Sequence, residues 1–130
     1  MKKILLILFI LLLPTVSSAK NLSDLKIRLV SGLKDDCKYT GKKVSGGYEI
    51  NGCYWPTQNI IYINSNLSSE SFNYVLLHEF GHWITEGEDI NLFNNDWELV
   101  ADWFAFWAMG MKSSPEKNDF FKALMGKLNI

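Results

Sequence analysis

Short apolar segments alternate with turn residues through the first half of the chain. The clearest segment is Asn59–Asn64, whose β-branched and aromatic positions Ile60, Ile61, Tyr62 and Ile63 predict a strand. Tyr48–Ile50 and Cys53–Trp55 flank an Asn-Gly pair that is typical of a hairpin turn. These segments together predict a small, mostly antiparallel sheet built as a β-meander.

Residues 22–33 carry two competing patterns. Leu25, Leu29 and Leu33 recur at helical spacing behind a possible cap at Ser23. The run Ile27–Val30 also suits a strand. We favour the helix and keep the strand as the alternative.

The second half changes to a helical period. Phe72, Val75, Leu76, Phe80 and Trp83 predict a helix over about Glu70–Thr85. Asp96 can cap a strongly apolar helix from Trp97 to about Met109, whose aromatic side chains we assign to the core. Ser114-Pro115-Glu116 predicts the start of a last helix that ends near Lys127. The fold class is therefore α+β, with one domain over residues 20–130.

The first 19 residues have the layout of a secretory signal peptide. Lys2 and Lys3 precede an apolar run over Ile4–Leu13, and Ser17-Ser18-Ala19 supplies the small residues of a cleavage site. The run is too short to span a bilayer, which takes roughly 20 apolar residues. We expect cleavage after Ala19, a secreted or periplasmic protein, and no membrane span once the signal is removed.

Composition narrows the function further. The chain has 130 residues with 13 Lys and Arg against 14 Asp and Glu, which lacks the basic excess of a nucleic-acid-binding protein. We expect a monomer.

The two cysteines of the chain, Cys37 and Cys53, have one possible pairing in an oxidising compartment, and a bridge is favoured over two unpaired thiols.

Both histidines of the chain lie in the pentapeptide His78-Glu79-Phe80-Gly81-His82. Residues i and i+4 share one face of a helix, so the two imidazoles can bind a single zinc ion. Glu79 lies beside them and can take a proton from a zinc-activated water as it attacks a carbonyl carbon. The alternative is a pair of surface histidines with an incidental glutamate between them.

A catalytic zinc site needs a third protein ligand, and no third histidine exists. The candidates are carboxylates and one thiolate: Glu86, Glu88, Asp89, Asp96, Glu98, Asp102 and Cys53. Glu98 is favoured because it begins the next predicted helix after a connection long enough to reverse direction. Asp102, one turn later, can accept the other ring N–H of a ligand histidine. Otherwise Glu98 serves only the helix N-terminus and Asp102 is solvated.

The two motifs, His78-Glu79-Phe80-Gly81-His82 and Glu98 to Ala105, resemble the gluzincin pattern of zinc metallopeptidases. The spacing is similar to that of minimal gluzincins and of the family containing phage anti-repressor metallopeptidases. This resemblance implies a zincin-like core in which a sheet packs on an active-site helix and a glutamate helix. It also implies that the strand before the active-site helix, Ile60–Ile63, pairs with an extended substrate.

These observations predict an exported peptidase that uses one zinc ion, with peptide or protein substrates. Two alternatives stay open at this point: a non-catalytic, zinc-stabilised binding domain, and a zinc amidase acting on other amides. The group that stabilises the oxyanion is not selected among Tyr54, Tyr62 and Tyr74 by the sequence, and packing is the favoured role for each.

Overall fold

The computed structural model describes residues 20–31, 42–44, 47–49 and 51–129. Residues 1–19, which hold the predicted signal peptide, and Cys37 lie outside the described residues. The described elements are η1 (Leu22–Asp24), β1 (Lys26–Val30), β2 (Lys42–Val44), β3 (Gly47–Glu49), β4 (Gly52–Trp55), β5 (Ile60–Asn64), α2 (Ser69–Thr85), η2 (Asn91–Phe93), α3 (Trp97–Ala108) and α4 (Pro115–Gly126). The predicted α+β class is confirmed. Within this part of the chain, no helix has the length and apolarity to cross a membrane.

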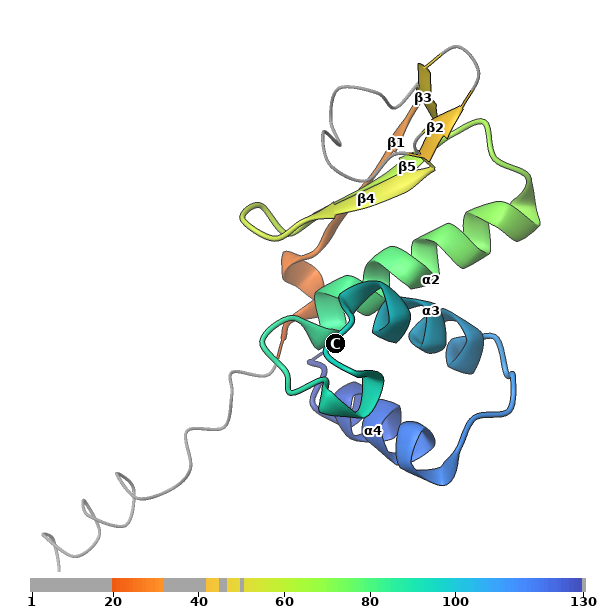
Figure 1. Ribbon diagram of the computed structural model, residues 1–130. Helices are drawn as coiled ribbons and strands as arrows, with labels where there is room; N and C mark the ends of the chain where they lie inside the picture. The colour runs from red at the N-terminus through yellow and green to blue at the C-terminus, as the bar shows by residue number, and fades with distance from the viewer. Residues whose placement is uncertain (1–19, 32–41, 45–46, 50, 130) are drawn as a thin grey trace, which may run out of the picture.

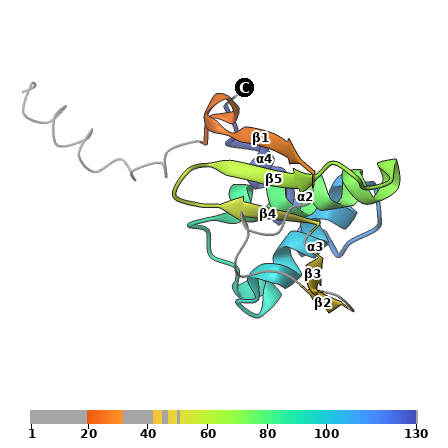
Figure 2. The same ribbon diagram turned by 90° about the horizontal axis from the view of Figure 1, so that it is seen from above.

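The elements form layers (Figure 1). A three-stranded sheet lies on one side of α2, and α3 and α4 lie below it. The strand order is β1-β5-β4, with β1 parallel and β4 antiparallel to β5. Figure 2 shows these three strands side by side over the helices. The sheet is therefore mixed, because it contains one parallel and one antiparallel pair of strands.

Two local predictions are corrected by this topology. Residues 22–33 do not form an α-helix: a short 3₁₀ turn is followed by strand β1, because pairing with β5 outweighs the helical spacing of the leucines. The strand near Tyr48 pairs with β2, in a hairpin that includes Lys42 and Lys43. It therefore does not form the predicted hairpin with Cys53–Trp55, whose described partner is β5.

The position of β5 overturns a further prediction. Ile60, Ile61, Tyr62 and Ile63 lie in the middle strand, with β1 bonded along one edge and β4 along the other. A strand with both edges paired has no free N–H and C=O row for a substrate. Ile61 and Ile63 are fully buried and pack against Val75 of α2. The strong apolar pattern of this segment thus reflects a core strand and not a substrate-binding edge.

The helices α2, α3 and α4 each begin at a side-chain cap, and two of these caps, Asp96 and Ser114, are the ones that the sequence predicts. The Ser68 hydroxyl accepts from the Ser71 amide at 3.3 Å at the start of α2. Asp96 accepts from the amides of Glu98 and Leu99 at 3.0 and 3.1 Å, which fixes the first turn of α3. Ser114 caps α4, with Pro115 in its first turn. These side chains satisfy amides that lack intrahelical partners.

The helices enclose an aromatic core between α2, α3, α4 and the connection that carries η2. Its buried members are Trp83, Ile84, Ile90, Phe93, Val100, Phe104, Phe121 and Leu124. The connection from Glu86 to Asn95 is therefore anchored by Ile90 and Phe93, which are 3% and 1% exposed. This anchoring sets where α3 begins relative to the end of α2.

A glycine inside the histidine motif allows α3 to approach α2 closely. A Cβ atom on Gly81 would lie 3.1 Å from the Ala101 Cα, 3.1 Å from the Phe104 Cβ and 3.2 Å from the Ala101 carbonyl oxygen. Two of these neighbours are backbone atoms, which cannot rotate away. The small residues Gly81 and Ala101 thus bring the first turn of α3 toward the histidines.

We expect Gly81→Ala to lower the free energy of unfolding by about 1 kcal/mol or more, because the overpacking exceeds the gain in helix propensity. Chemical denaturation of the metal-free protein measures this. Gly126→Ala is the matched control, because no atom lies within 4 Å of its added Cβ. The control should leave stability unchanged or raise it by up to about 1 kcal/mol. Equal effects of the two substitutions would contradict the packing role of Gly81.

Candidate metal centre and its adjoining pocket

The helix α2 places both imidazoles on one face. His78 and His82 are one turn apart, and their rings meet edge to face with centroids 4.8 Å apart. Their side chains are 14% and 17% exposed, so each is largely enclosed, and both line a pocket. The two Nε2 atoms are 3.2 Å apart. The helical spacing of the motif thus places two nitrogen donors together, as the sequence predicts.

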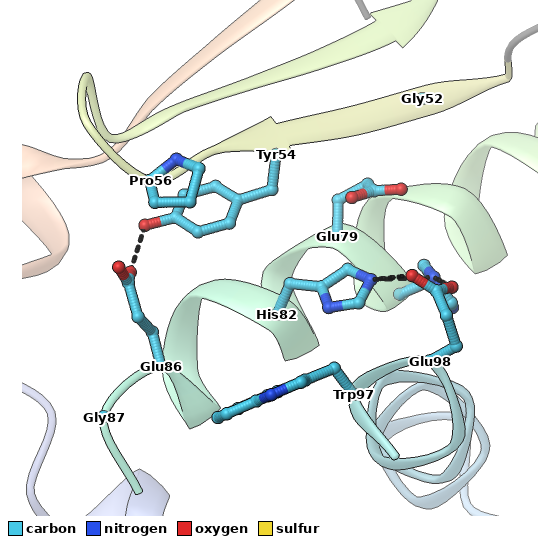
Figure 3. A pocket seen from close by; sticks show the side chains of 10 residues that line it. Gly52, Tyr54, Pro56, Glu79, His82, Glu86, Gly87, Trp97 and Glu98 are labelled. Atoms are coloured by element: carbon cyan, nitrogen blue, oxygen red, sulfur yellow. Dashed lines mark hydrogen bonds and ion pairs between the residues drawn. The ribbon is translucent and has the colours of Figure 1, made fainter. Parts of the chain in front are cut away.

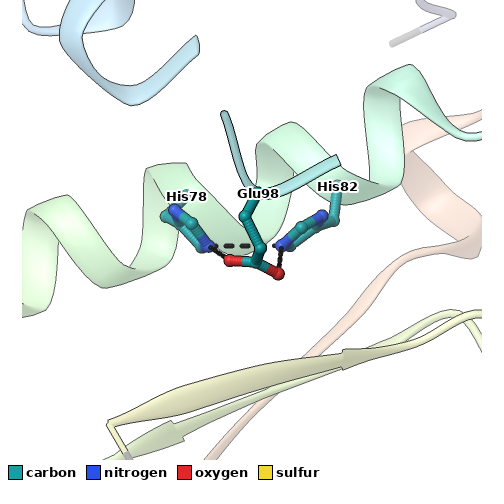
Figure 4. A group of neighbouring side chains, drawn as sticks. All are labelled: His78, His82 and Glu98. Atoms are coloured by element: carbon teal, nitrogen blue, oxygen red, sulfur yellow. Dashed lines mark hydrogen bonds and ion pairs between the residues drawn. The ribbon is translucent and has the colours of Figure 1, made fainter. Parts of the chain in front are cut away.

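Glu98 of α3 completes a three-residue group (Figure 4). Its Oε2 lies 3.1 Å from His78 Nε2, and its Oε1 lies 3.1 Å from His82 Nε2. One potential ligand atom from each residue lies within 4.8 Å of the others. Among the described residues this metal-capable group contains Glu98, and the other candidates for a third ligand do not belong to it.

Those other candidates have different contacts. Asp96 caps α3, and Asp89 accepts from the Asn91 amide at 2.9 Å. Glu88 lies 3.9 Å from the Lys127 ammonium. Cys53 is 4% exposed on β4, in a cluster with Val30, Trp55 and Tyr62. Its predicted bridge to Cys37 stays a prediction, because Cys37 lies outside the described residues.

The three donors suit zinc in number, type and spacing. Two imidazole nitrogens and one carboxylate are a ligand set found in catalytic zinc sites, which leave a fourth position open. Tetrahedral ligands about 2.1 Å from one ion stand about 3.4 Å from each other. The separations of 3.1–3.2 Å observed here are close to that value.

The group is strongly coupled electrostatically. Hydrogen bonds from His78 and His82 hold the pKa of the Glu98 carboxyl well below its usual range, although burial opposes this. Burial favours the neutral form of His78, but its hydrogen bond to Glu98 and the nearby carboxylates outweigh burial and raise its pKa. A proton and a zinc ion compete for His78 Nε2, because the nitrogen must be unprotonated to bind the ion.

Asp102 holds the other nitrogen of His78. The Asp102 Oδ1 lies 2.8 Å from His78 Nδ1, and an ionised carboxylate can only accept, so Nδ1 carries the proton. This arrangement directs Nε2 toward Glu98 and His82. The Tyr74 hydroxyl donates to the same Oδ1. Burial, then this hydrogen bond, raises the pKa of Tyr74. Asp102 thus lies where the sequence predicts it.

Asp102→Ala should weaken zinc binding by about 10–100-fold, because the His78 ring loses the acceptor that fixes its tautomer and orientation. Competition against a chromophoric chelator measures the dissociation constant. Asp119→Ala, which removes an exposed carboxylate of α4, is the control for the change in net charge. If both variants bound zinc equally well, the positioning role of Asp102 would be excluded.

Glu79 lies beside the metal group, under the edge of the sheet. It is 7% exposed and is one of only two buried polar residues among those described. A Cβ on Gly52 would lie 3.4 Å from the Glu79 Cγ and 2.5 Å from the Val75 Cγ1, so β4 packs directly onto this part of α2. Burial raises the pKa of the Glu79 carboxyl, while His82 and His78 oppose that change. The sheet therefore shields Glu79 from bulk water.

A pocket of about 380 Å³ adjoins the metal group (Figure 3). It is lined by Gly52, Tyr54, Pro56, His78, Glu79, His82, Glu86, Gly87, Trp97 and Glu98. The Tyr54 hydroxyl donates to Glu86 Oε2 at 2.5 Å. Burial, then this hydrogen bond, raises the pKa of Tyr54. The pocket joins the edge of the sheet, the face of α2 that carries the histidines, and the start of α3.

Two of the lining residues, Glu86 and Trp97, were given other roles from the sequence. Glu86 follows His82 by one helical turn, and this spacing was a usable signal for a shared face. Trp97 was assigned to the core with the other aromatic residues of α3, and this is wrong: its side chain is 44% exposed and lines the pocket. Phe104, in contrast, is 2% exposed and does belong to the core.

The combination of fold and site defines a class of protein. A sheet covers a helix that carries His78, Glu79 and His82, and a second helix supplies Glu98, which is the arrangement of a gluzincin-type zinc metallopeptidase domain. Residues 42–110, just over half of the chain, match the family model of the IrrE N-terminal-like domain, Peptidase_M78. The chain belongs to this family. No curated protein and no solved structure matches it.

Proposed function

We propose that this protein is an exported, zinc-dependent peptidase that acts as a monomer on peptide or protein substrates. The observation that carries the proposal is the convergence of His78, His82 and Glu98 at one end of a pocket that the buried Glu79 also lines. Membership of the Peptidase_M78 family supports it. A shielded carboxylate beside three metal ligands, at an open pocket, is an arrangement suited to hydrolysis of an amide.

The residues at the metal group have separate roles in the proposed hydrolysis. His78, His82 and Glu98 would hold the zinc ion, and Asp102 orients His78. Bound zinc lowers the pKa of water to about 7 and polarises a carbonyl oxygen. Glu79 would accept a proton from the attacking water and return it to the leaving amine. Its burial beneath β4 limits competing hydrogen bonds from solvent.

The edge of the sheet supplies a place for the substrate backbone. In the described three-stranded sheet β4 is the outer strand next to the pocket, and its residues Gly52 and Tyr54 line that pocket. An extended peptide can add to a free strand edge through main-chain hydrogen bonds. The substrate would therefore lie between β4 and the histidines of α2.

Metal dependence tests the activity. The purified protein should cleave an unfolded protein substrate, lose that cleavage in a chelator such as 1,10-phenanthroline, and regain it when zinc is added. The assay is fragment mass spectrometry. A protein that retains zinc but cleaves no substrate would instead support a zinc-stabilised binding domain, and cleavage that survives full removal of the metal would exclude a zinc mechanism.

The proposal that the protein is exported rests on residues 1–19 alone. It predicts the mature chain that signal cleavage leaves. Expression in a bacterial host should give a protein outside the cytoplasm whose intact mass corresponds to a chain beginning at Lys20. Comparison of the mass before and after reduction and alkylation also tests the Cys37–Cys53 bridge. A protein that keeps Met1 and stays in the cytoplasm would show that the N-terminal segment is not a cleaved signal.

A further inference from the structure

The pocket extends beyond the metal group to a carboxylate that hydrolysis itself does not require. Glu86 follows His82 by four residues, so it lies about one helical turn, roughly 5.4 Å, farther along the same face of α2. It caps the helix as its first non-helical residue and its side chain is 43% exposed. A side chain of the substrate that points away from the scissile bond along α2 would reach Glu86.

Flat side chains enclose the path between the metal group and Glu86. Figure 3 shows Tyr54 and Pro56 on one side of the pocket and the Trp97 ring on the other. Trp97 stands at the first turn of α3 and is 44% exposed. An exposed indole is a favourable surface for a cation or for the methylene stem of a long side chain.

Charge distinguishes the possible occupants of this space. Of the described residues that line the pocket, three are glutamates and none is Lys or Arg. The two contacts described for Glu86, from the Tyr54 hydroxyl and from Lys20 Nζ at 3.7 Å, both meet Oε2. Its Oε1 therefore has capacity to accept from a ligand. An apolar side chain would fit the walls but would cover Oε1 without donating a hydrogen bond to it, which is unfavourable.

We infer that Glu86, Tyr54, Pro56 and Trp97 form a subsite for an arginine or lysine side chain of the substrate, at a residue that flanks the scissile bond. The methylene stem lies between Trp97 and Pro56, and the cationic end meets Glu86. Arginine is favoured over lysine because its planar guanidinium stacks on the indole and donates two hydrogen bonds to a carboxylate. The inference rests on the proposed peptidase function, whose substrate class it specifies.

Peptide binding tests the subsite without turnover. Zinc-loaded Glu79→Gln protein is titrated with short peptides of otherwise randomised sequence that carry one fixed residue, arginine or its uncharged isostere citrulline. We expect the arginine set to bind about tenfold more tightly, the effect of one charge-assisted contact. Glu86→Gln should remove the difference, and Trp97→Ala should weaken binding of the arginine set. Glu88→Gln, which removes a neighbouring carboxylate outside the pocket, should leave the difference intact.

The outcomes separate this inference from the proposed function. Equal binding of the arginine and citrulline sets, or a difference that survives Glu86→Gln, would overturn the subsite. If Glu86→Gln fails to fold, the comparison of the two peptide sets in the Glu79→Gln protein still decides. A preference for arginine in binding, together with no cleavage of any peptide by the wild-type zinc protein, would support the subsite and reject the peptidase function.

Discussion

Glu79→Gln is expected to lower peptide hydrolysis by about 10²–10⁴-fold while zinc stays bound. The amide has the shape of the carboxylate but cannot take a proton from water. Glu79 is not part of the group formed by His78, His82 and Glu98, so its loss removes the base and leaves the metal ligands in place. The measurements are kcat/KM on a cleaved peptide and zinc content by atomic absorption.

The control for this variant removes an exposed carboxylate from the same helix. Glu70→Gln changes the first turn of α2, outside the described pocket, and should keep full activity and full zinc occupancy. A fully active Glu79→Gln protein would rule out Glu79 as the base. Loss of zinc together with activity would show that Glu79 acts through the metal site and not on water.

Glu98→Ala is expected to weaken zinc binding by more than about 100-fold, a larger loss than removal of the supporting residue Asp102. Two imidazoles on one helix then remain as the protein ligands. Because zinc binding stabilises the folded state by mass action, the variant should also lose the rise in melting temperature that zinc produces in the wild type. Chelator competition and thermal unfolding with and without zinc measure both effects.

Glu116→Ala provides a matched comparison, because Glu98 and Glu116 are both acidic residues in the first turn of a helix. Each substitution removes a favourable interaction with the helix dipole, worth about 0.3–1 kcal/mol at an exposed site. Of these two glutamates, Glu98 contacts the histidines and Glu116 does not line the pocket beside them. Unchanged zinc affinity in Glu98→Ala would place the third ligand elsewhere and would remove the main structural support for a gluzincin-type site.

Local signals were sufficient for α2, α3 and α4 and for most of the metal group. The caps Ser68, Asp96 and Ser114 fix where each helix begins, because an unpaired amide needs a nearby acceptor wherever the helix lies in the fold. His78 and His82 meet because a helix places residues four apart on one face. The strands were predicted less well, because a strand is stabilised by partners that are distant along the chain.

Residue pairing decided what the patterns left open. Lys26–Val30 became a strand because β5 was available to pair with it, and Ile60–Ile63 became the centre of the sheet because β1 and β4 bond to its two edges. The sequence of either segment does not reveal its partners, since the same pattern of apolar residues suits an edge strand and a central strand.

The sequence by itself determined that this chain holds both of its histidines at helical spacing around Glu79, and that Glu98 and Asp102 follow on a separate helix. It determined these because periodicity and capping are local properties. The tertiary structure alone decided that Glu98 meets the histidines, that Gly81 and Ala101 set the distance between the helices, and that Trp97 and Glu86 extend the pocket. Those relations depend on how whole elements pack, because close packing, and not spacing along the chain, fixes which side chains share a cavity.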